Sequence, residues 1–206
     1  MNRFGDRLSS SHPPFKIEYQ HDAAVQRLSS HLAQRFRAKE LDQDIVVLCI
    51  GTDRSTGDAL GPLVGTKLKS LYPKSLSVYG TLEDPVHAVN LVEKLDMINR
   101  THENPLMIAI DACLGQFSNV GYINVADGPL KPGAGVKKEL PAVGTFHITG
   151  IVNVGGFMEY FVLQNTRLHV VMSMAEVISG GIYQAANFLH NRPQWGSVNS
   201  MLSEHP

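Results

Sequence analysis

Two aspartates that lie far apart in the sequence are the strongest candidates for catalysis. Asp58 lies in the polar stretch that begins at Gly51, and Asp111 comes directly after the apolar run 106–110. Ligands of open α/β sheets bind beyond the carboxyl ends of the strands, so we expect both carboxylates at one edge of a sheet. Paired carboxylates repel each other, and the pair titrates as a unit in which one acid keeps a proton while the other activates water.

Each of these acids also has a structural interpretation. An acid in a first helical turn is favoured by the helix dipole, which would explain Asp58 without any chemistry. Asp111 would equally accept hydrogen bonds from a neighbouring loop. Asp53 is a third candidate, although turn formation explains it too. The spacing of Gly51 and Gly57 matches neither a phosphate-binding loop nor a dinucleotide-binding loop.

His147 is the residue that would complete such a site. One imidazole and the carboxylates of Asp58 and Asp111 form a ligand set that suits Zn²⁺ or another divalent first-row ion. A pure aspartate pair requires no metal. Alternatively, His147 carries a proton, since an imidazole titrates near neutral pH.

A cysteine and two further histidines are weaker candidates. Cys113 follows Asp111 by two residues and is either a thiol nucleophile with His147 as its base or a packed small hydrophobe. His87 lies at an expected helix start and would border the cleft. His169 lies in an apolar run, so we expect it to be packed.

The elements that must position these residues follow from the apolar pattern. Apolar runs without alternation predict strands buried on both faces, at 45–50, 106–110 and 168–172, with weaker strands at 76–80 and 121–125. Helical spacing predicts helices at 25–36 (capped by Asp22), 58–71 (capped by Thr56), 86–98, 151–163 and 174–189. This alternation predicts a three-layer α/β/α sandwich with a mostly parallel central sheet. The stretch 128–144, rich in Gly and Pro, predicts a functional loop.

Length and composition narrow the class of protein. A chain of 206 residues predicts one domain over residues 22–206, preceded by a flexible arm over residues 1–21. The net charge of −1 argues against binding nucleic acid through phosphate neutralisation. Two cysteines make no disulfide framework, and there is neither a signal-peptide core nor an apolar run long enough to span a membrane. We therefore expect a soluble, cytoplasmic protein.

Several motifs resemble those of the bacterial spore germination protease, in the same order. They are Gly57-Asp58-Ala59-Leu60-Gly61-Pro62, Ile110-Asp111-Ala112, Pro132-Gly133-Ala134-Gly135-Val136-Lys137-Lys138-Glu139-Leu140 and, more loosely, Thr81-Leu82-Glu83. In its short length and as a whole, the chain resembles the YyaC family of sporulation proteins, a smaller relative of that protease.

A second resemblance is to the hydrogenase maturation endopeptidases. They share the Ile-Asp-Ala strand end, and His147 with Thr149-Gly150 is similar to their Ser-Leu-His-x-Thr-Gly segment. This resemblance implies that Asp58, Asp111 and His147 correspond to the residues that hold the nickel of the substrate. Both families imply a phosphorylase/hydrolase-like α/β/α fold.

We therefore expect an endopeptidase of sporulation or germination that cleaves a protein or peptide substrate with Asp58, Asp111 and His147. The expected substrate-binding residues are Thr52, Asp53, Glu83, Gly133, Gly135 and Lys137, with Lys137 and Lys138 guiding an acidic substrate. No nucleic acid or membrane partner is expected, a homo-oligomer is compatible with the sequence, and the resemblance implies the forespore or spore core.

Two alternatives remain open from the sequence. One is a non-catalytic sporulation factor that keeps the fold and binds a partner through the cleft or through the loop 128–144. The apolar segment 155–162 would then serve docking or an oligomer interface, unless it packs in the core. The other is a small-molecule hydrolase with the same acid pair.

Overall fold

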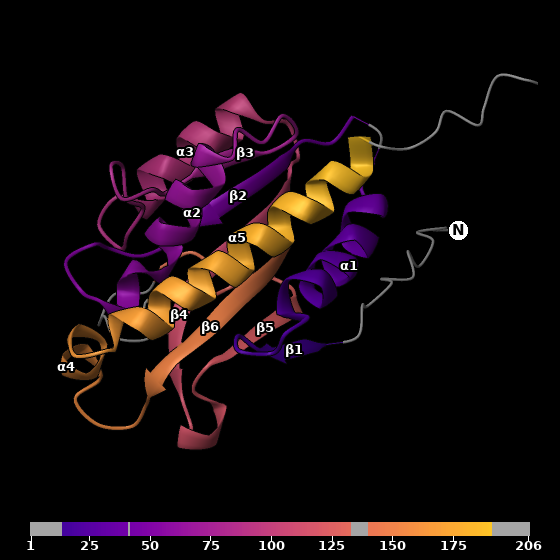
Figure 1. The fold of residues 1–206 in the computed structure, drawn as a ribbon. Coiled ribbons are helices and arrows are strands. Elements are labelled where there is room, and N and C mark those ends of the chain that lie inside the picture. The colour runs from indigo at the N-terminus through magenta and orange to yellow at the C-terminus, as the bar shows by residue number, and fades with distance from the viewer. Residues whose placement is uncertain (1–13, 41, 133–139, 191–206) are drawn as a thin grey trace, which may run out of the picture.

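A six-stranded sheet forms the middle layer of the protein (Figure 1). The computed structural model describes residues 14–40, 42–132 and 140–190. The strands are β1 (Phe15–Glu18), β2 (Ile45–Cys49), β3 (Ser77–Tyr79), β4 (Leu106–Gly115), β5 (Tyr122–Asp127) and β6 (Phe146–Val154), in the order β1-β5-β6-β4-β2-β3. The strands β6, β4, β2 and β3 pair in parallel, while β5 and β1 are antiparallel to their neighbours. The predicted parallel pairing therefore holds for four of the six strands.

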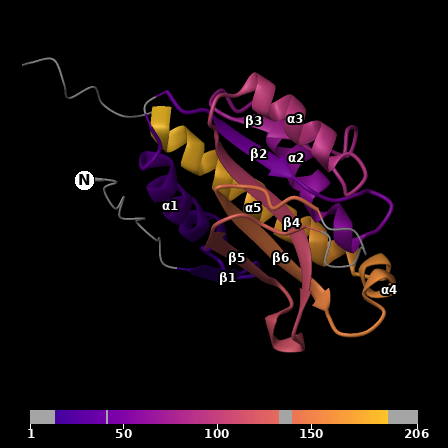
Figure 2. The same ribbon diagram turned by 180° about the vertical axis from the view of Figure 1, so that it is seen from behind.

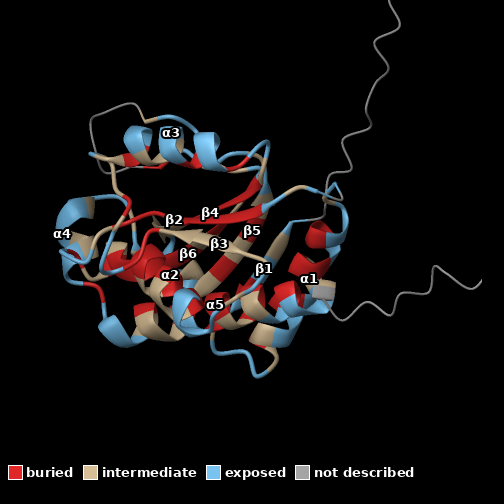
Figure 3. Cartoon of the chain, turned by 90° about the horizontal axis from the view of Figure 1, so that it is seen from above, coloured by how far each residue is buried: buried red, intermediate tan, exposed pale blue. Residues whose placement is uncertain are grey.

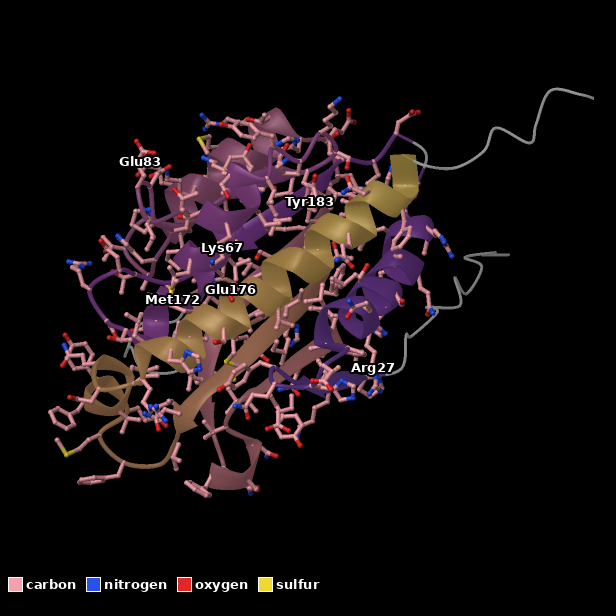
Figure 4. All side chains as sticks on the ribbon, in the orientation of Figure 1. Arg27, Lys67, Glu83, Met172, Glu176 and Tyr183 are labelled. Atoms are coloured by element: carbon pink, nitrogen blue, oxygen red, sulfur yellow. The ribbon has the colours of Figure 1, made fainter. Side chains whose placement is uncertain are left out.

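Helices cover both faces of this sheet. They are α1 (Ala24–Arg37), α2 (Leu60–Ser70), α3 (Leu91–Thr101), α4 (Glu159–Gln164) and α5 (Leu168–His190), with the 3-10 turns η1 (Gly57–Ala59) and η2 (Phe117–Asn119). Helices α1, α2 and α5 pack together on one face, whereas α3 lies on the other, as the rear view in Figure 2 and the view from above in Figure 3 show. The Lys67 side chain of α2 and the Glu176 carboxylate of α5 form an ion pair at 3.2 Å (Figure 4). The three-layer α/β/α sandwich is confirmed.

Two apolar cores, one on each face, explain why the central strands are apolar without alternation. In β2, Val47 enters the core beneath α1, α2 and α5, whereas Val46 and Leu48 enter the core beneath α3. In β4, Ile108 enters the core beneath α1, α2 and α5, whereas Met107 enters the core beneath α3. Each strand is therefore buried on both sides, as parallel strands between helices are.

The helix α3 covers only part of its face. Among the described residues, the core beneath α3 takes side chains from β2 and β4 but none from β1, β5 or β6. Figure 2 shows α3 on the side of β2 and β3, away from β1 and β5. Within the described part of the chain, one half of the sheet is therefore left without a helix on this face.

Two of the predicted elements are wrong. The run 168–172 is the start of α5, because Val171, Met174, Ala175 and Ile178 are buried at helical spacing along that helix. The burial of one helix face outweighed the local preference of β-branched residues for a strand. His169, expected to be packed, is exposed.

The predicted helix 151–163 is mostly strand and loop. Residues 151–154 continue β6, and only α4 near the end of the range is helical. The register of β6 against β4 shifts after Ile151, so that Val152 is an extra residue without a partner. Such a bulge interrupts the alternation that identifies a strand in a sequence.

The N-terminal part and two helix caps also differ from expectation. Phe15–Glu18, inside the expected flexible arm, forms the edge strand β1, and residues 1–13 lie outside the described part. Neither Asp22 nor Thr56 caps a helix through its side chain. Within the described residues, no helix is both long and apolar enough to cross a membrane.

Candidate active site

The turn after β2 brings Asp58 to the edge of the sheet. Gly51 has a φ of +146°, and a Cβ atom there would lie 2.0 Å from the Asp58 carbonyl oxygen. This close approach requires glycine. The Thr52 N–H donates a hydrogen bond to the same carbonyl at 3.2 Å. The turn η1, with Asp58 at its centre, is thereby held against the end of β2 and also contacts β4.

Asp111 lies where β4 leaves the core. The five residues before it are buried, and Asp111 itself is half-buried. Burial raises the pKa of Asp111 to about 8, against the effect of the hydrogen bond that Oδ1 accepts from the Ala112 N–H at 2.8 Å. The charge of Asp58 raises this pKa further, so the two carboxyl groups lie within electrostatic reach. The structure thus brings both aspartates to one edge of the sheet.

The two acids differ in how strongly they hold a proton. Burial also raises the pKa of Asp58, but the nearby Ser55 hydroxyl lowers it. Ser55 Oγ is buried and has no partner in hydrogen-bond geometry among the described residues. Because its pKa is raised to about 8, Asp111 holds a proton near neutral pH.

His147 lies on β6 at a different level from Asp111. The β4–β6 register pairs His147 with Ala109, whereas Thr149 is the partner of Asp111. The His147 Nδ1 atom lies 2.9 Å from the Gly128 carbonyl oxygen. A carbonyl only accepts, so Nδ1 carries a proton and Nε2 of the neutral ring is left as an acceptor.

The expected three-residue metal site is not assembled. Among the residues that the structure describes, no three His, Cys, Asp or Glu side chains are grouped so that they could hold a metal ion. Asp58 and Asp111 approach each other, but His147 is displaced by two residues along β6, about 6.6 Å in a parallel strand. The donor set of Asp58, Asp111 and His147 therefore does not fit a metal ion in this arrangement.

Cys113 is not suited to be a nucleophile. It follows Asp111 by two residues on the same strand, and burial raises its pKa to about 11, against the effect of the Thr149 hydroxyl. The charge of Asp111 adds to the rise. A thiol with such a pKa is protonated near neutral pH, whereas the thiolate is the reactive form.

Thr149 is a site residue that sequence reasoning did not select. It is half-buried, pairs with Asp111 and lies beside the Cys113 thiol. Recognising residues 146–154 as one strand parallel to β4 would have identified it, because His147 and Thr149 then share a face.

Three of the expected substrate-binding residues, Thr52, Asp53 and Glu83, lie in the described part of the chain. Thr52 is half-buried, and its Oγ1 accepts hydrogen bonds from Arg54, while Asp53 in the same turn is exposed. Glu83 is exposed beyond β3, which is two strands from β4, and it lies at the periphery in Figure 4. Gly133, Gly135, Lys137 and Lys138 lie outside the described residues.

His87 has a local structural role. Its N–H donates to the Asn90 Oδ1 atom at 2.8 Å, and its Nδ1 accepts from the Val89 N–H at 3.3 Å. These bonds shape the turn that leads into α3.

The fold is of a class that also contains a peptidase of known structure. It is similar to the NiFe hydrogenase maturation protease HycI from Thermococcus kodakarensis KOD1, with a TM-score of 0.51 and 19% identity over 76% of this chain and 98% of that chain. This likeness concerns the fold alone.

The chain belongs to the family described as "Protein of unknown function (DUF1256)", whose model matches residues 16–181. It is 52% identical over 195 residues to the uncharacterized protein YyaC of Bacillus subtilis (strain 168), across 95% of this chain and 93% of that protein. The expected kinship with YyaC is confirmed.

Proposed function

We propose that the protein is an endopeptidase that hydrolyses a peptide bond with Asp58 and Asp111 as an acid–base pair. The observation that carries this proposal is the contrast between the two acids. The pKa of the Asp111 carboxyl is raised to about 8 by burial and by the charge of Asp58, so it holds a proton near neutral pH. Asp58 then remains the charged member of the pair.

The contrast assigns a role to each aspartate. Asp111 donates its proton to the carbonyl oxygen of the peptide bond, and Asp58 takes a proton from water as the water oxygen bonds to the carbonyl carbon. The proton on Asp58 then passes to the peptide nitrogen while the carbon–nitrogen bond breaks. Asp111 regains a proton from the hydroxyl formed in the first step, which restores the starting state.

The motif resemblance to the spore germination protease supports a protein substrate made during spore formation or germination. The residues that carry this resemblance, 57–62 and 110–112, are the ones that surround the two aspartates. On the same support, we place the protein in the cytoplasm of the forespore or spore.

A cleavage assay with matched variants tests the proposal. Purified protein is incubated with a mixed peptide library, and mass spectrometry identifies new termini. Asp58→Asn and Asp111→Asn are each expected to reduce the cleavage rate by about a hundredfold to ten-thousandfold. Asp42→Asn is the matched control, since Asp42 is exposed just before β2, at the opposite end of that strand from the acid pair. Cleavage that persists in both site variants would refute the assignment.

A non-catalytic binding role is the second candidate, and one observation favours it. The segment around α4 exposes Phe157 at 82%, with Met158, Tyr160 and Phe161 also exposed. The sequence left open whether this segment packs in the core, and these four residues do not. Exposed apolar clusters are typical of sites that bind a partner. Absence of cleavage at high protein concentration would favour this role.

A further inference from the structure

One level of the sheet carries four polar side chains in a row. The register pairs Asp111 of β4 with Thr149 of β6, and Thr149 with Asn124 of β5. Asn124 in turn pairs with Lys16 of β1. Side chains of directly paired residues lie on the same face of a sheet. We call Asp111, Thr149, Asn124 and Lys16 the cross-strand row.

The row lies on the half of the sheet that α3 leaves open. Ala109, two residues before Asp111, is buried beneath α3, so Asp111 faces the same side. The neighbours of the row along β5 and β1, Ile123 and Ile17, enter the core on the opposite face. Thr149 and Asn124 are half-buried and Lys16 is exposed. These side chains are therefore accessible to a ligand that approaches from the α3 side.

The ammonium group of Lys16 is held in place at the outer end of the row. Its Nζ donates a hydrogen bond to the Asn119 Oδ1 atom at 2.8 Å and lies 4.1 Å from the centroid of the Tyr122 ring. None of the ion pairs between described residues includes Lys16. Glu18, the acid nearest along β1, pairs with Tyr122 at the next level on this face. A positioned cation that makes no ion pair with the described residues favours an acidic ligand, because little side-chain entropy remains to be lost on binding.

We propose that the cross-strand row binds an extended segment of the peptide substrate, with an acidic side chain of that segment at Lys16. This inference rests on the proposed function, since the row begins at Asp111. The hydroxyl of Thr149 and the amide of Asn124 supply both donors and acceptors for the peptide backbone. Neighbouring strands are about 4.8 Å apart, so the row spans about 14 Å, or about four residues of an extended peptide. The substrate therefore carries its acidic residue about four positions from the cleaved bond.

A binding assay in an Asp58→Asn background tests the row without cleavage. Two fluorescein-labelled libraries of short random peptides are used, one with a single Glu and no basic residue and the other with a single Lys and no acidic residue. Fluorescence anisotropy measures Kd for each. We expect tighter binding of the acidic library, and an added Lys16→Glu substitution is expected to weaken that binding by about threefold to tenfold.

Two further variants show whether the effect of Lys16→Glu on binding comes from the charge at this site. Lys69→Glu makes the same charge change at an exposed lysine at the end of α2, on the other face, and is expected to leave both Kd values unchanged. Asn124→Leu removes the side-chain amide. We expect it to raise the Kd of both libraries by the same factor, because contacts to the peptide backbone do not depend on the charge of the peptide. Thermal unfolding verifies that each variant is folded.

The proposal is overturned if neither library binds, if both bind equally well, or if Lys16→Glu and Lys69→Glu have the same effect. Selective binding of the acidic library without any cleavage by the unsubstituted protein would contradict the proposed peptidase function. It would still support the proposal that the cross-strand row binds an acidic peptide. The two failures are therefore distinguishable.

Discussion

Asp111 lies opposite Thr149 in the parallel β4–β6 ladder, and His147 lies two residues before Thr149 on β6. This register separates the imidazole from the acid pair by two residues along β6. The Gly128 carbonyl orients the His147 ring independently of the aspartates. The pair of acids, rather than a group of three ligands, is thus the unit on which the following predictions are based.

The pH dependence of cleavage should report the acid pair. The pKa of Asp111 is raised to about 8, so the cleavage rate is expected to fall above this pH as Asp111 loses the proton that it donates. The rate should also fall at acidic pH, because Asp58, the base, becomes protonated. Initial rates between pH 4 and pH 10 measure the profile. A rate that keeps rising above pH 9 would contradict the assignment of Asp111 as the acid.

Folding stability should decrease from mildly acidic to mildly basic pH. The pKa of Asp111 is about 8 in the folded protein and near its ordinary value of 3.8 in the unfolded chain, so the folded state binds the extra proton between these values. The stabilisation is complete below about pH 4 and is lost as the pH rises through about 8. The slope for one proton is at most about 1.4 kcal/mol per pH unit.

Urea unfolding at pH 5, 6.5 and 8 measures this dependence. Asp111→Asn should flatten it, because the amide does not titrate. Asp42→Asn, at an exposed position, should retain the slope of the unsubstituted protein. Equal slopes in all three proteins would show that Asp111 titrates normally.

Cys113 should be poorly reactive and dispensable for cleavage. Its pKa is raised to about 11, so iodoacetamide at pH 7.5 is expected to modify it about a hundredfold more slowly than a free cysteine. Cys49 does not interfere with the measurement, because it is buried. Cys113→Ala should keep the cleavage rate within about threefold, since the thiol takes no part in the acid–base step. Rapid alkylation that also abolishes cleavage would contradict this prediction and support Cys113 as the nucleophile.

Gly61→Ala should destabilise the fold at the site. A Cβ atom there would lie 2.0 Å from the Ile50 carbonyl oxygen, so α2 must move away from the end of β2. We expect a loss of about 3 kcal/mol in the free energy of unfolding. Gly180→Ala in α5 is the control, because its Cβ would meet only the Val25 side chain at 3.3 Å. Urea unfolding compares the two, and equal stabilities would show that the close approach at Gly61 is unimportant.

The apolar pattern was sufficient to predict the layers of the fold but not all of its elements. The runs 45–50 and 106–110 are strands because both of their faces are buried, and that burial is visible in the sequence as an uninterrupted apolar segment. The run 168–172 has the same local appearance, yet it is helical, because its burial continues at helical spacing for the length of α5. Local composition cannot distinguish these two cases.

The two aspartates could be selected from the chain alone, since each follows an apolar run and the ends of parallel strands share one edge of a sheet. The folded arrangement was needed to show which acid keeps the proton, because burial and the distance between charges depend on packing. It was also needed to find Thr149, Asn124 and Lys16 on the same level of the sheet as Asp111. These residues come from three strands that are distant in the chain, and hydrogen-bond register, which no single segment encodes, brings them to one level.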